Sequence, residues 1–406
     1  MTSLTAGQSL MLNNRLWSLR QVRPLKGRNL ELEAIGASDA SQGMTRILRA
    51  VGYGDDLFIA QRRGGYWRAN LHTDWTDSNF GPLLQCQPAT VLDLLDAHSR
   101  HPAAGKMKNS FSWSYSRAAK YRDCPRAYYY HYYAAWEGWQ QNAPPPVRRA
   151  YLLKNLTDLP RWRGTLVHET LKFAMARLKA GHPVDEAGLL DQLRRRARAD
   201  ITDSQSGGYR QSPNKLTGFQ EHYYKTGQPP TDWQAAQSTA EQLLHTFVNS
   251  DLYANLRSQP AKTFLNVETL QSFIVAGVKV WVQMDLARYN GEAIYLYDWK
   301  TGIIDPAEVR RQLGVYGLYA KHAWPELASI PIKGVVYALA DDQLHRFDMD
   351  DTLLQNTQKN IETDIAQLQN LLFDPQANLA EIRRFPMIDD LGVCRHCQFR
   401  ELCGRE

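Results

Sequence analysis

The chain has 406 residues, more than the ~250–300 at which one hydrophobic core stops growing, so two domains, or one domain with a large appendage, are expected. Its composition, 43% hydrophobic and 22% charged, is that of a globular protein, and no apolar run approaches the ~18 residues of a membrane helix. The first residues show no secretory pattern, so we expect a cytoplasmic protein in a reducing compartment and no membrane partner. A net charge of +6 fits a polyanionic partner but is too small to identify one.

Residues 1–105 are predicted to form a separate, small α+β domain. Strand-like runs such as DLFIAQR and GYWRANL precede the helical pattern ATVLDLLDAHSR, and the loop-like HPAAGKMKNS marks a boundary before residue 110. No motif in this part carries chemistry, so the sequence does not predict its role.

Residues 110–262 are dominated by helical patterns. Ser114 is placed to cap a helix that carries Tyr121, Cys124 and Tyr128 at spacings of three and four. The runs RGTLVHETLKFAMARLK and TDWQAAQSTAEQLLHTFVNS also have helical patterns. We expect a helical insertion over about residues 181–262 of a domain that spans residues 110–406.

The most informative strand pair is VKVWVQMDLARYNGEAIYLYDWKTG. Its two alternating runs flank Asn290 and Gly291, a strong signal for a two-residue turn. Such a turn fixes the register of the hairpin. The resulting pairs are Tyr289 with Glu292, Gln283 with Asp298, and Trp281 with Lys300.

In that register Asp285 is a diagonal neighbour of Asp298 on the same face, about 7–8 Å away, and Lys300 points the same way. Two neighbouring aspartates repel unless a cation or a proton lies between them, so the pair indicates a Mg²⁺ or Mn²⁺ site. The Lys300 ammonium would stabilise negative charge on an attacking hydroxide or on a phosphoryl-transfer transition state. A surface Asp–Lys pair is the alternative, and an isolated D-x-K pattern would favour it.

The C-terminal run GVCRHCQFRELCGRE contains Cys394, Cys397 and Cys403, one thiol short of a tetrahedral set. In a reducing compartment thiols more often bind metal or stay buried than form disulfides. The fourth ligand is either Cys86 or Cys124. We favour Cys124 because the proline that follows it has no N–H and cannot extend a helix into a bound cluster.

Taken in order, these motifs resemble those of the PD-(D/E)XK nuclease superfamily, and specifically its RecB-like branch. The likeness consists of the opening S-x-S-R…Y-x-x-C-P-R, the G-x-x-x-H of GTLVHETL, the acidic strand LNVETL, the aspartate and D-x-K of the hairpin, and QLGVYGLY. It spans roughly residues 110–406. In the iron–sulfur subgroup, which includes CRISPR-associated and AddB-type nucleases, one cysteine precedes the nuclease motifs and three follow them.

The resemblance implies an α/β fold of the restriction-endonuclease type, in which helices flank a mixed central sheet. It also implies that His168, Asp285, Asp298 and the backbone carbonyl of Trp299 hold Mg²⁺ or Mn²⁺, with Lys300 as a further catalytic residue. Trp299 stands where the family often has Tyr or Phe, which leaves the carbonyl in place.

The same resemblance gives Gln312 and Tyr316, one helical turn apart, a role in positioning the nucleic-acid strand. Without it, these two residues would be an amphipathic pair at the edge of a core, and His168 a histidine at the edge of an apolar helix face. Glu268 is either a group behind the metal ligands or a strand-end charge.

For the thiols, the resemblance implies a [4Fe–4S] cluster on Cys124, Cys394, Cys397 and Cys403 that fastens the two ends of the nuclease module. Zinc is the alternative, but structural zinc sites are commonly built from two local pairs of ligands. Cys86 is expected outside the module. The tyrosines between residues 128 and 133 are expected to pack around the cluster-bearing helix rather than to stack bases.

The function implied is that of a metal-dependent DNA nuclease, an exonuclease on single-stranded or end-bearing DNA, in DNA repair, recombination or anti-phage defence. The alternative is a non-catalytic DNA-binding or scaffold subunit of a helicase or defence complex. Residues 1–105 would then connect the protein to a helicase or another subunit.

Overall fold

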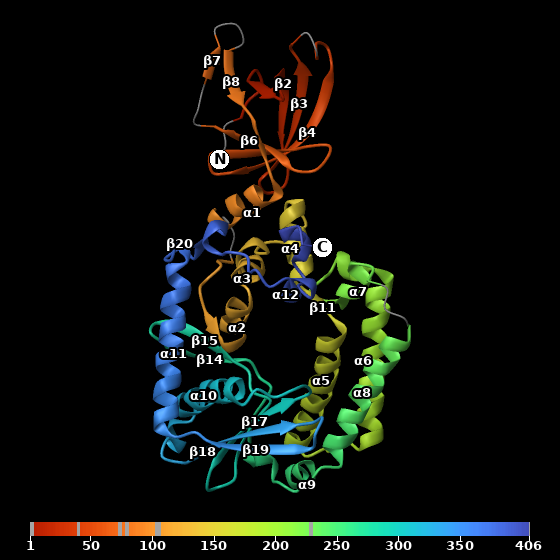
Figure 1. Ribbon diagram of the computed structural model, residues 1–406, viewed down its shortest axis with the longest axis vertical. Helices are drawn as coiled ribbons and strands as arrows, with labels where there is room; N and C mark the ends of the chain where they lie inside the picture. The colour runs from red at the N-terminus through yellow and green to blue at the C-terminus, as the bar shows by residue number, and fades with distance from the viewer. Residues whose placement is uncertain are drawn as a thin grey trace. The chain divides into compact units, whose positions relative to one another are not determined.

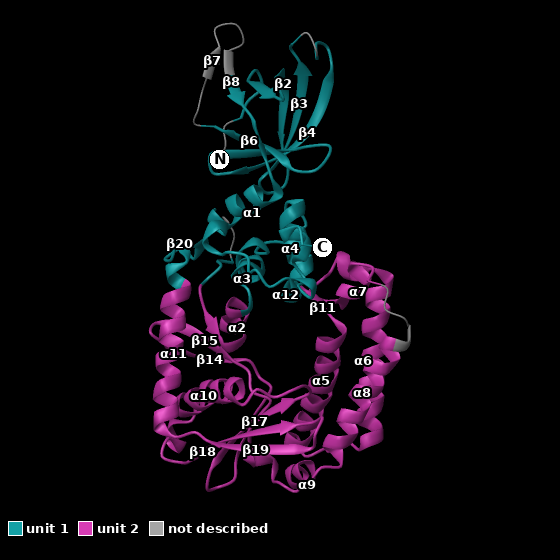
Figure 2. Ribbon diagram, in the orientation of Figure 1, with its two compact units in different colours: residues 1–110, 123–154, 369–406 teal, residues 111–122, 155–368 magenta. Residues whose placement is uncertain are grey.

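The computed structural model describes residues 4–38, 41–71, 75–77, 81–101, 107–226 and 230–405. Internal contacts divide the chain into two compact units (Figure 2). Unit 1 comprises residues 1–110, 123–154 and 369–406, and unit 2 comprises residues 111–122 and 155–368. The backbone therefore passes between the units four times. The division into two domains, 1–105 and 110–406, stays a prediction. The contacts within the chain group the N-terminal strands with two later segments.

Unit 1 begins with a nine-stranded sheet in the order β7-β8-β1-β2-β3-β4-β5-β6-β9 (Figure 1). Neighbouring strands are antiparallel except β1 and β8, which are parallel. Alternate residues, for example Leu32 and Ala34 or Leu57 and Ile59, enter one core, as the period of two in a strand requires. The strands are β1 (Ser9–Leu12), β2 (Arg15–Pro24), β3 (Asn29–Gly36), β4 (Thr45–Tyr53), β5 (Asp56–Ala60), β6 (Tyr66–Asn70), β7 (Trp75–Asp77), β8 (Gly81–Gln85) and β9 (Gln87–Ala89).

The rest of unit 1 is mainly helical. Helix α1 (Val91–Arg100) begins with a capping box, in which the Thr90 side chain accepts from the Asp93 N–H and the Asp93 carboxylate accepts from the Thr90 N–H. Around it lie α3 (Pro125–Tyr129), the π-helix η1 (Tyr130–Ala134), α4 (Pro145–Lys154), β20 (Leu372–Asp374), β21 (Leu379–Ala380), η5 (Ile382–Arg384), α12 (Leu391–Arg395) and η6 (Arg400–Cys403).

The tyrosines of α3 and η1 form much of this helical core, as predicted. The Tyr129 hydroxyl donates to the carbonyl of Leu95 at 3.1 Å, and the Tyr130 hydroxyl donates to the carbonyl of Leu402 at 3.1 Å. Tyr128 and Tyr133 are also buried. These rings fill the interior of unit 1 and are not available as a stacking surface.

Unit 2 is built on a five-stranded mixed sheet, in the order β13-β16-β17-β18-β19. Strands β17 and β18 are parallel and are joined through helix α10 (Pro306–Ala323), whereas the other pairs are antiparallel. This confirms the expected mixed α/β architecture. The strands are β13 (Phe264–Val267), β16 (Leu286–Tyr289), β17 (Ile294–Lys300), β18 (Ile332–Ala338) and β19 (Gln343–Asp348).

Helices cover both faces of this sheet (Figure 1). Helix α10 packs on one face, where Leu313 occupies the space that a Cβ atom at Gly334 would need. The other face presents Tyr297 and Trp299 to a core shared with α5, α6, α8 and α9. The main helices of unit 2 are α2 (Tyr115–Asp123), α5 (Leu159–Lys179), α6 (Glu186–Ser206), α7 (Gln220–Tyr223), α8 (Pro230–Val248), α9 (Asp251–Arg257) and α11 (Asp351–Asn370).

Short elements complete unit 2. They are β10 (Trp113–Ser114), β14 (Gln271–Val275) and β15 (Val278–Val282), which form one small sheet, the pair β11 (Leu156–Thr157) and β12 (Gly218–Phe219), and the 3₁₀ turns η2 (Gly208–Arg210), η3 (Ala261–Thr263) and η4 (Pro325–Leu327). In the part of the chain that is described, no helix is long and apolar enough to cross a membrane.

The predicted hairpin between β16 and β17 exists, but its predicted turn is wrong. Tyr289 pairs with Ile294, so the loop has four residues, 290–293. The Asn290 side chain explains the longer loop, because its Oδ1 accepts from the backbone N–H of Glu292 at 3.0 Å and of Ala293 at 2.8 Å. The predicted partner of Lys300, Trp281, lies in β15, which belongs to the other sheet.

The predicted helix through Cys124 is also wrong in part. Ser114 does cap α2, since its Oγ accepts from the Arg117 N–H at 3.1 Å. The helix then ends at Asp123, because a residue before proline is disfavoured in the helical region. Cys124 is extended, with φ −163° and ψ 112°, and caps α3 through its Sγ, which accepts from the Ala127 N–H at 3.5 Å.

Candidate active site

The four-residue loop brings the two hairpin aspartates closer than predicted. Leu286 lies opposite Tyr297, so the next position outward places Asp285 directly opposite Asp298. Asp285 is fixed there because its Oδ2 accepts from the backbone N–H of Trp299 at 2.6 Å. Both aspartates are buried.

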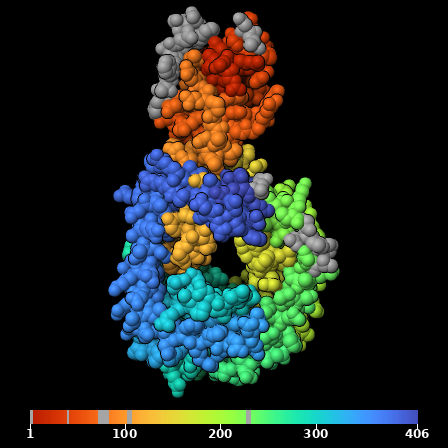
Figure 3. Space-filling view, in the orientation of Figure 1, coloured from red at the N-terminus to blue at the C-terminus, as the bar shows by residue number. Residues whose placement is uncertain are grey.

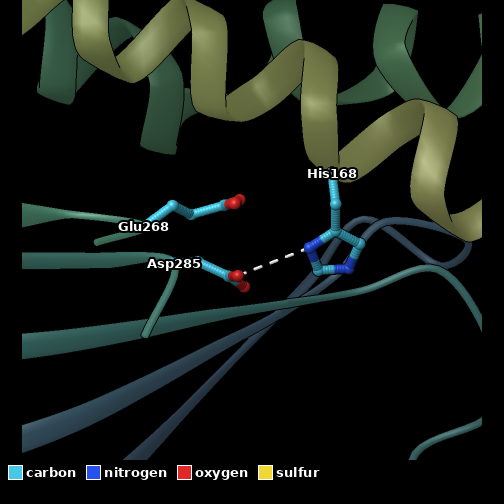
Figure 4. A group of neighbouring side chains, drawn as sticks. All are labelled: His168, Glu268 and Asp285. Atoms are coloured by element: carbon cyan, nitrogen blue, oxygen red, sulfur yellow. Dashed lines mark ion pairs between the residues drawn. The ribbon is translucent and has the colours of Figure 1, made fainter. Parts of the chain in front are cut away.

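The side chains of His168 and Glu268 meet the Asp285 carboxylate and form a group of three with it (Figure 4). His168 points down from α5, and its Nδ1 lies 3.4 Å from Asp285 Oδ1. Glu268, just after β13, extends alongside Asp285. One ligand atom of each residue lies within 4.8 Å of the others, so the three side chains can hold a metal ion.

Sequence reasoning left Glu268 between two roles, and the structure places it among the possible ligands. Its backbone has φ +41°, and its N–H donates to the Asp285 carbonyl at 3.2 Å. In the sequence, the acidic strand pattern LNVETL is what indicates this residue. The sequence did not show the left-handed turn after β13, which directs this carboxylate at Asp285.

Asp298 takes part in a second network. Its Oδ2 lies 2.6 Å from Lys300 Nζ, and its Oδ1 accepts from Gln312 Nε2 at 3.2 Å and from the Tyr316 hydroxyl at 3.3 Å. The Lys300 ammonium also donates to Gln312 Oε1 at 2.8 Å. Gln312 and Tyr316 share one face of α10, as their spacing predicts, and the network orients both the carboxylate and the ammonium.

Burial and crowding set the ionisation of this site. Burial raises the pKa of Asp298, and the charge of Asp285 raises it further, against the effect of Lys300. Burial and the Asp285 charge raise the pKa of Glu268 to about 7. Burial lowers the pKa of His168, but Asp285 and the nearby carboxylates outweigh it and raise that pKa to about 9. Without a cation the site therefore retains protons, which a divalent ion would displace.

The donor set fits a hard divalent cation. Glu268 and Asp285 are 8% and 9% exposed, and Glu268 Oε1 is buried without a hydrogen-bond partner in the described parts of the chain. A buried carboxylate oxygen is unfavourable unless a proton, a donor or a cation satisfies it. Carboxylate oxygens are the ligands that Mg²⁺ and Mn²⁺ prefer.

The remaining predicted positions lie around this centre. Gly164, one turn before His168, faces the Thr301 side chain, whose Oγ1 would be 3.1 Å from an added Cβ. The Trp299 ring is buried on the opposite face of the sheet and packs 5.2 Å from the Phe247 ring, measured between ring centroids. Only the Trp299 backbone is therefore available to the site.

The thiols form a separate group in unit 1. Cys124, Cys394, Cys397 and Cys403 all line one small cavity, beside Tyr130 and Phe399. No three of them lie within 4.8 Å of one another in the described chain, so they are not gathered to the spacing of ligands on a single ion. The C-terminal segment, dark blue in Figure 3, lies at the surface of its unit. Cys86 is a partly buried thiol with a pKa that burial raises to about 12.

The mixed sheet carries buried carboxylates next to a lysine, a combination that can hold a divalent metal ion beside a positive charge. The sequence model of the PD-(D/E)XK nuclease superfamily matches residues 112–404. The chain therefore belongs to the PD-(D/E)XK nuclease superfamily, whose members are nucleases that use divalent metals.

A solved structure titled "Crystal structure of SSO0001" is 18% identical to this chain. The match covers 45% of this chain and 77% of that one, with a TM-score of 0.24. No curated protein matches the sequence.

Proposed function

We propose that this protein is a Mg²⁺- or Mn²⁺-dependent deoxyribonuclease of the RecB-like branch, acting as an exonuclease on single-stranded or end-bearing DNA in repair, recombination or anti-phage defence. The observation that carries the proposal is the convergence of His168, Glu268 and Asp285 beside the Asp298–Lys300 pair. These residues come from four separate elements or their ends, and the fold brings them to one point.

His168, Glu268 and Asp285 would hold the cation, together with Asp298 and the backbone carbonyl of Trp299. When bound, the ion would lower the pKa of a bound water and offset charge on the scissile phosphate. Lys300, held by Asp298 and Gln312, would orient the attacking water and stabilise the charge that develops on the phosphate oxygens. Gln312 and Tyr316 would position the strand.

The proposal includes a [4Fe–4S] cluster on Cys124, Cys394, Cys397 and Cys403. Its support is that all four thiols line one cavity. Around one zinc ion, four sulfurs at ~2.3 Å would lie about 3.8 Å apart, whereas a four-iron cluster binds each thiolate to a different iron and spaces the sulfurs more widely. One distant thiol with a local trio, in place of two local pairs, also favours the cluster over zinc.

A non-catalytic DNA-binding or scaffold subunit is the second candidate. Such a subunit would have no need to keep Asp298 or Lys300, and both are present and paired. In either case residues 1–105 would serve as the contact to a helicase or another subunit.

The test is cleavage of labelled single- and double-stranded DNA by protein purified without air, with Mg²⁺ or Mn²⁺. Lys300→Ala and Asp298→Ala should each lower cleavage by ~10³-fold or more, because both residues act on the reacting phosphate. DNA binding measured in EDTA should persist in both. Removal of the Asp298 carboxylate should even tighten it, since a negative charge facing phosphates is lost.

Lys333→Ala is a matched control, because Lys333 is a partly exposed lysine on the neighbouring strand β18. It should cleave like the wild type. Cleavage by Lys300→Ala at the wild-type rate would overturn the catalytic assignment.

A further inference from the structure

Unit 2 contains a cavity of about 670 Å³ on the face of the central sheet opposite to Asp298. Arg288 pairs with Tyr295, three positions before Asp298 on β17, so Arg288 and Asp298 lie on opposite faces. We call this cavity the Arg288 pocket; its lining includes Arg288, Tyr295, Tyr297, Tyr337, Asn255 and Arg346. Helix α9 and strands β17 to β19, which contribute to it, lie together in Figure 1.

The floor of the pocket contains an unsatisfied cation. Arg288 is only 5% exposed, and its Nε and Nη1 have no hydrogen-bond partner among the residues that the structure describes. A buried guanidinium with two unpaired nitrogens is costly, because these nitrogens have lost water without gaining an acceptor. The N–H groups on these nitrogens are charge-assisted donors for the oxygens of a phosphate or a carboxylate. Because the Nε–H is parallel to an N–H of Nη2 and not of Nη1, each of the two nitrogens needs an acceptor of its own.

Aromatic rings and hydroxyls adjoin this guanidinium. Tyr297 and Tyr337 are buried in the floor, and the Tyr295 and Tyr297 rings have centroids 6.3 Å apart. Burial raises the pKa of Tyr297 despite the opposing effect of Arg288, so its hydroxyl is a neutral donor at physiological pH. The rim carries the carboxamides of Asn249, Asn255 and Asn290. Such groups suit a ligand with a ring and polar edges.

The charges limit how many anionic groups the ligand carries. Arg288 and Arg346 face Asp251 and Asp342 in the same lining, and Asp342 accepts a hydrogen bond from the Tyr337 hydroxyl. The pocket is therefore balanced in charge. It can take one phosphate on Arg288, whereas a polyanionic strand laid across it would meet the two carboxylates at the rim.

We propose that the Arg288 pocket binds a nucleoside monophosphate, with the phosphate on the Arg288 guanidinium and the base against the tyrosine rings. The volume lies within the roughly 300–1,000 Å³ of small-molecule pockets. The same chemistry is offered by a free nucleotide and by the phosphorylated terminal nucleotide of a DNA strand. This site does not depend on the proposed catalysis, because its binding residues lie outside the carboxylate centre.

The experiment measures calorimetric binding and thermal stability in EDTA, so that metal-dependent binding at the carboxylate centre is removed. The probes are a deoxynucleoside 5′-monophosphate, the matching nucleoside, inorganic phosphate, and one oligonucleotide with and without a 5′-phosphate. The monophosphate should bind and raise Tm, and the nucleoside should not. Binding of the phosphorylated oligonucleotide alone would identify a strand end as the source, and binding of the monophosphate alone would identify free nucleotide.

Arg288→Met should weaken binding of the monophosphate by at least tenfold. Because it replaces an unpaired buried cation with an apolar chain, it should leave Tm without ligand unchanged or higher. Arg346→Gln, at the exposed rim, should weaken binding to a lesser degree without a folding defect. Arg195→Gln removes an exposed charge on α6 and should bind like the wild type.

Two results would overturn the site: no binding of any phosphate probe to the wild type, or an Arg288→Met protein that melts lower and binds as tightly as the wild type. The Lys300→Ala variant should still bind the monophosphate. Cleavage and monophosphate binding are therefore tested separately. A negative result for the proposed nuclease activity does not refute the Arg288 pocket, and the reverse also holds.

Discussion

At the scale of single residues, the carboxylate centre is a concentration of buried negative charge. Glu268 and Asp285 are both nearly inaccessible, and two cations adjoin them: Lys172 Nζ lies 3.7 Å from Glu268 Oε2, and His168, whose pKa is raised to about 9, lies beside Asp285. His168 loses its proton when it binds a metal, so it can no longer offset the carboxylate charge. The strongest requirement of this centre is therefore for a further positive charge, which a divalent ion would provide.

We expect Glu268→Gln to weaken Mn²⁺ affinity on the order of 10–100-fold, the range found when groups supporting a metal site are removed. The amide keeps the size of the side chain but has only one carbonyl oxygen to offer and no charge. Calorimetric titration of the metal measures the change.

Glu169→Gln is the matched control for that variant, because Glu169 is an exposed neighbour of His168 on α5 and lies outside the metal-binding group. Its Mn²⁺ affinity should be that of the wild type. Equal affinities for Glu268→Gln and Glu169→Gln would remove Glu268 from the ligand set.

At the scale of elements, α1 is connected to two other parts of unit 1 through one histidine. The His98 ring lies 3.1 Å from the Tyr53 hydroxyl of β4, through Nδ1, and 2.8 Å from the Trp136 carbonyl, through Nε2. Nε2 must donate to the carbonyl, and in the neutral ring Nδ1 then accepts from the hydroxyl. Burial lowers the pKa of His98 to about 4 and so opposes its protonation.

This neutral histidine predicts an acid-dependent loss of stability. Between about pH 6.5 and 4 the unfolded chain binds a proton at His98 that the folded chain does not, so the free energy of unfolding falls as the pH is lowered through that window. From pH 7 to pH 5 the loss should be about 2 kcal/mol. Urea unfolding at the two pH values measures it.

His98→Gln keeps a side chain that can both donate and accept but has no titrating group. It should be less stable than the wild type at pH 7, because the geometry of the two hydrogen bonds is perturbed. Between pH 7 and pH 5 the free energy of unfolding of this variant should fall by about 2 kcal/mol less than that of the wild type. An identical pH dependence in both proteins would refute the assignment.

The elements also show what local sequence determines. The hairpin was predictable because alternating runs around Asn290 and Gly291 leave few alternatives. The same pattern contained Asp285 and the D-x-K motif of Asp298 and Lys300. The register was not predictable, because it depends on whether the Asn290 side chain closes a longer loop. Similarly, the sequence shows the proline after Cys124, but the predicted helix continued through Cys124, whereas α2 ends at Asp123. The Arg288 pocket had no signal, since its lining comes from segments about 100 residues apart.

At the scale of the whole molecule, the cysteines belong with unit 1 and not with the carboxylate centre. Cys124 lies at the start of the second segment of unit 1, and Cys394, Cys397 and Cys403 lie near the end of its third segment. A shared cluster would cross-link these segments. Its loss should therefore affect the packing of α3, η1 and the C-terminal turns as well as any optical signal.

We expect Cys124→Ala and Cys394→Ala, purified without air, to lose iron, sulfide and brown colour together and to melt at least ~5 °C lower, which corresponds to roughly 2 kcal/mol for a unit of this size. Cleavage activity should fall with them. Absorbance, metal analysis and thermal unfolding measure the three effects. The wild type should contain about four iron atoms and four sulfides per chain.

Cys86→Ala is the control, because Cys86 lies outside the thiol-lined cavity in the part of the chain described. It should keep the colour and Tm of the wild type. Stoichiometric zinc in a colourless wild type would replace the cluster by a zinc site, and an undiminished Tm in Cys124→Ala would contradict the cross-link itself.

The passage of the chain between its two units also sets an order of events during synthesis. Unit 2 ends at residue 368, so all of it is synthesised before the third segment of unit 1. At ~5–20 residues per second, the first residue of that segment follows the end of the second segment by roughly 10–40 s. Until residues 399–402 are made, Tyr130 of η1 has no Phe399 ring or Leu402 carbonyl to contact. The residues of the carboxylate centre are therefore all made before the last segment of unit 1. The final turns of the protein then complete the unit that contains its first strand.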